Sequence, residues 1–140
     1  MTDSSTAYVL LVDDDEDDRF LLQEVFRQYC PDCKLSCVED SEQLLNTLAN
    51  SAVLPALILL DLNMPFMSGF EMLPAIKTIP GYRSIPVVIL TTSDQPTDRQ
   101  KALELGADDF MTKPATLYQF NQLILKIKQR WLQPAIKSVK

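Results

Sequence analysis

The sequence predicts an α/β fold in which five parallel strands form one doubly wound sheet with helices on both of its faces. Apolar runs of strand length alternate with amphipathic helical patterns five times along the 140 residues, and such alternation is typical of βαβ units. Several of these runs are apolar almost without interruption, as strands buried on both faces of a parallel sheet are. The expected strands are residues 8–12, 35–38, 56–60, 87–90 and 110–112.

Apolar stripes at helical spacing predict the first and the last helix. In each stripe the apolar residues recur every three or four positions, so they lie on one side of a helix and face the sheet. The last stripe is interpreted as core packing rather than as a binding surface. The two stripes are Leu21, Leu22, Val25, Phe26 and Tyr29, and Leu117, Phe120, Ile124, Ile127 and Trp131.

Capping residues predict the three helices between them. Gly106 is a natural stop for the fourth helix, because glycine adopts the left-handed conformation in which many helices end. Pro74 lies beyond the first turn of the third helix, where it removes a backbone hydrogen bond, so we expect a late start or a kink there. The expected N-terminal caps are Ser41, the pair Ser68 and Glu71, and the pair Thr97 and Gln100.

Composition and charge exclude several classes of function. The formal net charge is −6, which argues against a nucleic-acid partner. The chain has no histidine, so it cannot use one as a base, a metal ligand or a phosphoryl carrier. The longest apolar stretch, residues 52–60, is too short to span a bilayer, and residues 1–6 are too polar for a signal peptide. We therefore expect a cytoplasmic protein with no membrane partner.

The length of the chain favours a single domain. We expect one folded unit over residues 7–132, flanked by tails at residues 1–6 and 133–140. The residues after Lys113 suffice for one helix and a short tail, so no output domain is expected.

The three cysteines are Cys30, Cys33 and Cys37. An odd number without a secretory signal argues against a disulfide framework. The first two have the C-x-x-C spacing of redox and zinc sites, but the sequence offers no evident fourth zinc ligand. We expect three reduced thiols around a helix-to-strand turn.

Reactive side chains follow four of the five expected strands. Open α/β sheets bind ligands at the carboxyl ends of their strands, so these side chains are expected to meet at one edge of the sheet. They are Asp13, Asp14 and Asp15 after the first strand, Asp61 after the third, Thr91, Thr92 and Ser93 after the fourth, and Lys113 after the fifth.

This cluster favours phosphoryl chemistry. Neighbouring carboxylates repel and raise one another's pKa. Mg²⁺ relieves that repulsion and commonly shares its site with a phosphate group. A carboxylate beside the ion can accept a phosphoryl group and form an acyl phosphate. The Lys113 ammonium and the Thr91 hydroxyl are suited to bind the phosphoryl oxygens.

Four short motifs follow one another at the expected strand ends, in residues 12–14, 59–65, 90–92 and 106–114, with Gly69 shortly after the second. Together they resemble the receiver domain of bacterial two-component response regulators, and the resemblance covers residues 8–131. It implies a flavodoxin-like (βα)5 fold with strand order 2-1-3-4-5. It also implies a signalling switch that catalyses only its own phosphorylation and dephosphorylation.

The resemblance assigns a role to each residue of the cluster. Asp61 is the expected phosphoacceptor, and Lys113 pairs with the phosphoryl group beside a cis peptide bond at Pro114. Thr91 is expected to move toward the phosphate and Phe110 to turn inward into the space that it leaves. Phe110 stands where tyrosine is frequent, so a switch step that needs the phenol hydroxyl is absent. The expected Mg²⁺ ligands are the carboxylates of Asp14 and Asp61 and the backbone carbonyl of Asn63, with Asp13 bound through water.

The resemblance also implies partners. The expected phosphodonor is a sensor histidine kinase or a histidine phosphotransfer protein. The expected output is contact with another protein, whose identity the sequence does not give, or with a second copy of the chain in a homodimer. The long loop at residues 79–85 resembles that of single-domain regulators that accompany phytochrome-type histidine kinases.

Three alternatives remain open at this point. Asp13, Asp15 and Glu24 fall at ligand positions of a calcium-binding loop, although Asp18 replaces its required glycine. The second alternative is a haloacid-dehalogenase-type phosphatase, because Asp13 and Asp15 resemble its nucleophile motif, although Glu16 stands where Thr or Val is usual. The third alternative is a pseudo-receiver that never accepts phosphate, and the complete set of site residues argues against it.

Overall fold

The computed structural model describes residues 7–64 and 67–132. The two expected tails, residues 1–6 and 133–140, lie outside the described residues. Five parallel strands form one sheet in the order β2-β1-β3-β4-β5, so the predicted doubly wound (βα)5 fold is confirmed. The strands are β1 (Ala7–Val12), β2 (Cys33–Val38), β3 (Leu57–Leu60), β4 (Val87–Thr91) and β5 (Asp109–Thr112).

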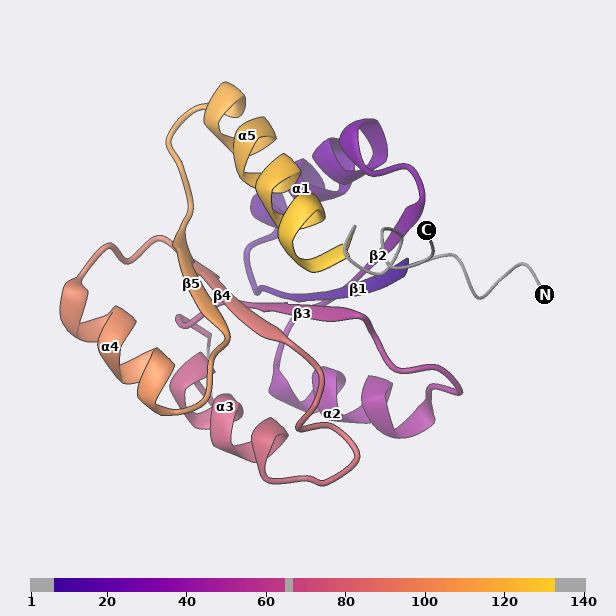
Figure 1. Ribbon diagram of the computed structural model, residues 1–140, viewed down its shortest axis with the longest axis vertical. Coiled ribbons are helices and arrows are strands. Elements are labelled where there is room, and N and C mark those ends of the chain that lie inside the picture. Colours follow the sequence, from indigo (N-terminus) through magenta and orange to yellow (C-terminus); the bar gives the residue numbers. More distant parts are fainter. Residues whose placement is uncertain (1–6, 65–66, 133–140) are drawn as a thin grey trace.

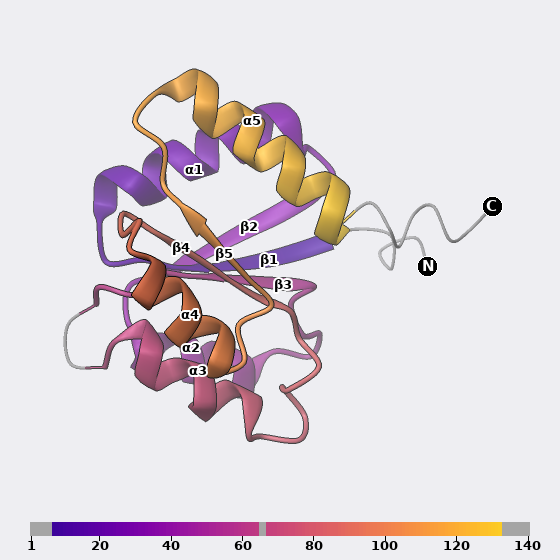
Figure 2. The same ribbon diagram turned by 60° about the vertical axis from the view of Figure 1, so that its left-hand side comes forward.

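Helices cover both faces of the sheet. α1 and α5 lie on one face, and α2, α3 and α4 lie on the other, as Figures 1 and 2 show. Among the described residues, no helix is long and apolar enough to cross a membrane. The helices are α1 (Glu16–Tyr29), α2 (Ser41–Asn50), α3 (Gly69–Lys77), α4 (Pro96–Glu104) and α5 (Leu117–Ile127), and the π-helical turn η2 (Lys128–Leu132) continues α5.

Two apolar cores lie against the two faces of the sheet. Successive side chains of a strand point to opposite faces. Leu10 and Val12 of β1 therefore join the core beneath α2, α3 and α4, whereas Val9 and Leu11 join the core beneath α1 and α5. All residues of β3 and β4 are buried. The prediction of strands buried on both faces is confirmed.

The start of α2 corrects the predicted cap. Asp40, not Ser41, is the N-cap residue, and its carboxylate accepts a hydrogen bond of 2.9 Å from the backbone N–H of Gln43. Ser41 is the first helical residue and is buried. Two adjacent residues could each serve as a cap, and the sequence pattern does not distinguish the extended residue from the first helical one.

The capping box of α3 is confirmed. Ser68 accepts from the N–H of Glu71, and the Glu71 carboxylate accepts from the N–H of Ser68. Of the two effects expected from Pro74, the late start is wrong, because α3 begins at Gly69 and continues through Pro74 to Lys77. The kink stays a prediction. The strong cap offsets the one hydrogen bond that proline removes.

The start of α4 also differs from the prediction. Gln95 is the N-cap, without a side-chain cap bond, and Pro96 is the first helical residue. Proline suits this position because its missing N–H would have no partner there. Asp98, inside the box predicted to begin at Thr97, instead accepts a 2.6 Å hydrogen bond from Ser93. Gly106 follows the helix with a φ of 113°, as predicted for a stop.

We expect Asp40→Ala to lower the free energy of unfolding by about 1 kcal/mol, because it removes the N-cap acceptor of α2. Ser41→Ala is the matched control and should change that free energy by less than about 0.5 kcal/mol. Urea unfolding followed by circular dichroism measures both. A larger loss for Ser41→Ala than for Asp40→Ala would contradict the observed cap.

Candidate functional site

The site lies at the carboxyl edge of the sheet. The loops that follow β1, β3, β4 and β5 gather at this edge, on the left-hand side of Figure 2. They bring Asp13, Asp61, Thr91 and Lys113 into one region, although the sequence separates the first and last of these by 100 positions. The predicted meeting of these side chains is therefore present in the structure.

Three carboxylates form the acidic cluster: Asp13, Asp14 and Asp61. Each offers one oxygen, and these oxygens lie within 4.8 Å of one another. Asp13 and Asp61 are buried, while Asp14 is exposed. Burial raises the pKa of Asp13, and hydrogen bonds from Lys113 and from the Asp15 N–H offset only part of that rise. Carboxylate oxygens with one solvent-exposed member fit a hard divalent cation that keeps some of its water, as Mg²⁺ does.

Lys113 balances the charge of this cluster. Its Nζ lies 2.6 Å from Asp13 Oδ2, 2.7 Å from Asp18 Oδ2 and 3.7 Å from Asp61 Oδ2. The lysine side chain is only 5% exposed. Burial by itself would lower the pKa of Lys113, but the hydrogen bonds with Asp13 and Asp18 outweigh it, and the pKa is raised. Lys113 therefore stays charged inside the site.

Asp18 is a member of the site that the sequence reasoning missed. It belongs to the first turn of α1, where Asp15 caps the helix by accepting from the N–H groups of Asp17 and Asp18. The signal was present in the helical spacing, since Asp18 falls four residues before Leu22, on the inward-facing stripe of α1. A carboxylate at an inward position indicates a buried cationic partner.

The predicted switch residues are both buried. Thr91 ends β4 with no exposed surface. Within the described part of the chain, its Oγ1 has no hydrogen-bond partner. Phe110 is 5% exposed and packs in the core beneath α4. A buried hydroxyl without a partner is unusual in a folded protein and calls for an explanation.

Asn63 lies beside the carboxylate of Asp61, the predicted acceptor. Its backbone N–H donates to Asp61 Oδ1 at 3.4 Å. The Asp61 backbone N–H in turn donates to Val12 at 3.0 Å, which fixes the acceptor segment against β1. Pro65, the last residue of the predicted acceptor motif, lies outside the described residues. The expectation of a cis bond at Pro114 is wrong, because no cis peptide occurs among the described residues, and the trans form is intrinsically favoured.

Gly69 allows α3 to approach the acceptor segment closely. Its N–H donates to Leu62 O at 3.0 Å. A Cβ at position 69 would lie 2.5 Å from the carbonyl oxygen of Asp61 and 2.9 Å from the Cα of Leu62. These are backbone atoms of the segment that carries the acceptor, so they cannot move aside without displacing it.

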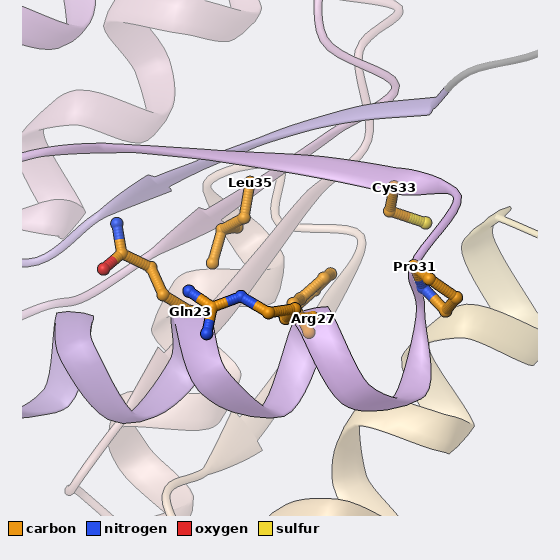
Figure 3. A pocket seen from close by; sticks show the side chains of 6 residues that line it. Gln23, Arg27, Pro31, Cys33 and Leu35 are labelled. Carbon is orange, nitrogen blue, oxygen red and sulfur yellow. The ribbon is translucent and has the colours of Figure 1, made fainter.

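The cysteines correct the expectation of three reduced thiols. Cys30 and Cys33 form a disulfide, and Cys37 is free. Cys30 caps α1 and Cys33 begins β2, and the turn between them places their Cα atoms 5.4 Å apart, which is within disulfide range. Rules based on cysteine count do not include this proximity. Cys33 lines a cavity of about 370 Å³ with Arg27, Pro31, Leu35 and two further residues (Figure 3).

The comparison with protein families identifies the family of this chain. The model described as response regulator receiver domain matches residues 9–127. The chain therefore belongs to the receiver-domain family of two-component response regulators. This assignment replaces the phosphatase alternative. The calcium-loop alternative fails as well, because a strand, β1, and not a helix precedes the acidic run.

Individual relatives support the subfamily resemblance of the long loop. Response regulator Rcp1 of Synechocystis sp. is 35% identical over 130 residues, which is 89% of this chain and 88% of Rcp1. A crystal structure of the phosphorylated cyanobacterial phytochrome response regulator RcpA is 34% identical with a TM-score of 0.84, covering 92% of this chain and 96% of that chain. The Mn²⁺-bound form of Rcp1 has a TM-score of 0.80 at 34% identity, covering 91% and 95%.

Other relatives are much longer than this chain. A probable cyclic di-GMP phosphodiesterase of Vibrio cholerae is 35% identical over 117 residues, which is 84% of this chain but 25% of that protein. The match thus spans a quarter of the length of that relative. The activity in its name belongs to that protein.

We expect Gly69→Ala to lower the free energy of unfolding by about 1–3 kcal/mol, because its Cβ would displace the backbone of the acceptor segment. Gly81→Ala is the matched control, since nothing lies within 4 Å of a Cβ there. Urea unfolding of both variants measures the difference. Equal stability of the two variants would show that α3 does not press on the acceptor segment as described.

We expect Mg²⁺ to stabilise the folded chain, by about 2.7 kcal/mol at 100 times its dissociation constant. Asp14→Asn should lose most of the stabilisation by Mg²⁺. In the presence of chelator its melting temperature should exceed that of the wild type, because the substitution removes one of three repelling charges. Asp17→Asn, an exposed neighbour outside the cluster, is the control. Thermal unfolding with and without Mg²⁺ measures both effects. An undiminished Mg²⁺ response in Asp14→Asn would exclude this carboxylate as a ligand.

Proposed function

We propose that this chain is a phosphorylation switch in which Asp61 accepts a phosphoryl group from a cytoplasmic sensor histidine kinase or histidine phosphotransfer protein. Residues 7–132 are the proposed receiver domain. The observation that carries the proposal is the Thr91 hydroxyl, which is buried at the carboxyl end of β4 with no partner among the described residues. Leaving such a group unpaired costs roughly 1–3 kcal/mol, and a phosphoryl oxygen on Asp61 would supply the missing acceptor.

The proposed reaction is attack by a carboxylate oxygen of Asp61 on the phosphorus of phosphohistidine. The new O–P bond forms as the P–N bond breaks, and the electron pair of that bond returns to the imidazole nitrogen. Asp61 attacks as a carboxylate, so no base has to take a proton from it. The Lys113 ammonium, 3.7 Å from Asp61 Oδ2, is placed to bind a phosphoryl oxygen and offset its charge.

The proposed cofactor is Mg²⁺. Asp14 and Asp61 would bind it through their carboxylates, Asn63 through its backbone carbonyl and Asp13 through water. The three carboxylate oxygens within 4.8 Å support this set, as does the Mn²⁺-bound form of the relative Rcp1. When bound, the ion would supply positive charge that offsets the charge of the phosphoryl oxygens.

The proposed switch links Thr91 and Phe110 to the surface formed by α4, β5 and α5. The Thr112 hydroxyl donates to Ser93 O at 2.8 Å, and the Arg99 guanidinium donates to Phe110 O at 3.0 Å. A movement of Thr91 toward a phosphoryl group would therefore be transmitted to β5 and α4. The output would be contact of this surface with another protein or with a second copy of the chain. The phosphoryl group favours one arrangement only by binding it more tightly.

Intact mass spectrometry tests the proposed acceptor. After incubation with phosphoramidate and Mg²⁺, we expect the wild type to gain one labile phosphoryl group. Asp61→Asn should gain none, and chelation of Mg²⁺ should prevent the gain in the wild type. Asp94→Asn, an exposed aspartate in the loop before α4, is the control and should be labelled like the wild type. Labelling of Asp61→Asn would mean that another residue is the acceptor, and no labelling of any variant would favour the pseudo-receiver alternative.

A further inference from the structure

Asp18 contacts the reactive lysine but has no part in the reaction proposed above. Its Oδ2 lies 2.7 Å from Lys113 Nζ, across 95 positions of sequence. The Asp18 side chain is 26% exposed and the lysine 5% exposed, so the pair lies at the mouth of the site. Asp18 is not part of the acidic cluster of Asp13, Asp14 and Asp61.

The Lys113 ammonium has three N–H groups, and two of them are used in hydrogen bonds. Two N–H groups donate to Asp13 and Asp18 at 2.6 and 2.7 Å. The distance to Asp61 Oδ2, 3.7 Å, is too long for a hydrogen bond. One donor of the ammonium group therefore remains for a further acceptor on the side of Asp61.

The distance of 3.7 Å between Lys113 Nζ and Asp61 Oδ2 leaves room for a phosphoryl group on Asp61. An acyl phosphate on Asp61 places the phosphoryl oxygens two bonds beyond the carboxylate oxygen, through phosphorus, so that one of them can come into hydrogen-bond range of the ammonium. If Lys113 instead contacted Asp61 directly, it would occupy the lone pairs that attack the phosphorus. Asp13 and Asp18 together hold the lysine at the distance that avoids this.

We infer that Asp18 is a positioning residue: it holds the Lys113 ammonium away from the Asp61 carboxylate and ready for an incoming phosphoryl group. The inference rests on the proposed function of Asp61. Loss of the Asp18 carboxylate allows the lysine to move onto Asp61, its nearest remaining acid besides Asp13. The acceptor then has to displace its own lysine before it reacts.

An effect of charge alone predicts a faster reaction in Asp18→Asn, whereas the inferred positioning role predicts a slower one. The direction of the change in rate therefore tests the inference. Asp17 and Asp18 are adjacent acids in the first turn of α1, and both lie at the positive end of the helix dipole. Removing either one removes a negative charge near the site and should favour an anionic phosphodonor. Of these two acids, Asp18 contacts Lys113, whereas Asp17 is exposed. A slower reaction in Asp18→Asn alone therefore reports the contact and not the charge.

The experiment measures the rate of phosphoryl gain from phosphoramidate by quenched-flow mass spectrometry across a range of Mg²⁺ concentrations. Asp18→Asn is expected to reduce the maximal rate on the order of tenfold, as displacement of a catalytic group does. The Mg²⁺ concentration for half-maximal rate should match that of Asp17→Asn, which should react at least as fast as the wild type. Thermal unfolding of the two variants verifies that both are folded.

A second experiment tests whether the effect of Asp18→Asn on the rate depends on Lys113. In a Lys113→Met background, Asp18→Asn should cause no further loss of rate, because a residue that acts through the lysine has nothing left to position. A maximal rate in Asp18→Asn equal to or above that in Asp17→Asn overturns the inference, and so does an undiminished effect in the Lys113→Met background. Both results leave the proposed acceptor intact. Failure of the wild type to gain a phosphoryl group would overturn the proposed function itself.

Discussion

The site depends on one electrostatic constraint, the compensation of buried carboxylates by one buried ammonium group. Asp13 and Asp61 are buried at the ends of neighbouring strands, and within the described residues Lys113 is the one cationic side chain that forms an ion pair with either of them. Breaking a buried ion pair by removing one partner costs roughly 3–5 kcal/mol in proteins generally. The last strand must therefore be in place before the first and third can carry their charges without a metal. The site is therefore complete only when β5 has joined the sheet.

The parallel topology explains why the site could be predicted from the sequence. In a doubly wound sheet every strand ends at the same edge, so a residue's position relative to its own strand fixes its place in the site. The predictions for Asp13, Asp61 and Lys113 needed only the strand ends, to within a residue or two. Thr91 illustrates this tolerance, since it was predicted to follow β4 and instead ends it. The error does not move its side chain away from the site.

Details that depend on contacts between neighbouring elements could not be predicted in the same way. Asp18 was not predicted as a site residue, because its lysine partner is 95 residues away in the sequence. The Cys30–Cys33 disulfide depends on how tightly the chain turns between α1 and β2. The cap of α2 depends on which of two adjacent polar residues is extended, and Asp40 has that conformation. In each case several local solutions are compatible with the pattern, and tertiary packing selects one.

Two features of the site remain incomplete in complementary ways. The Thr91 hydroxyl is a buried polar group without a partner among the described residues, and the Lys113 ammonium has a donor left on the side of Asp61. Both would be satisfied by oxygens added to Asp61, and neither is satisfied by the carboxylate alone. A phosphoryl group on Asp61 would bind more tightly to an arrangement that brings both donors to its oxygens than to one that does not. That difference in binding is the free energy available for a conformational change, because a ligand shifts an equilibrium only by its differential affinity for the two states. The incompleteness of the unphosphorylated site is therefore the physical origin of the proposed switch.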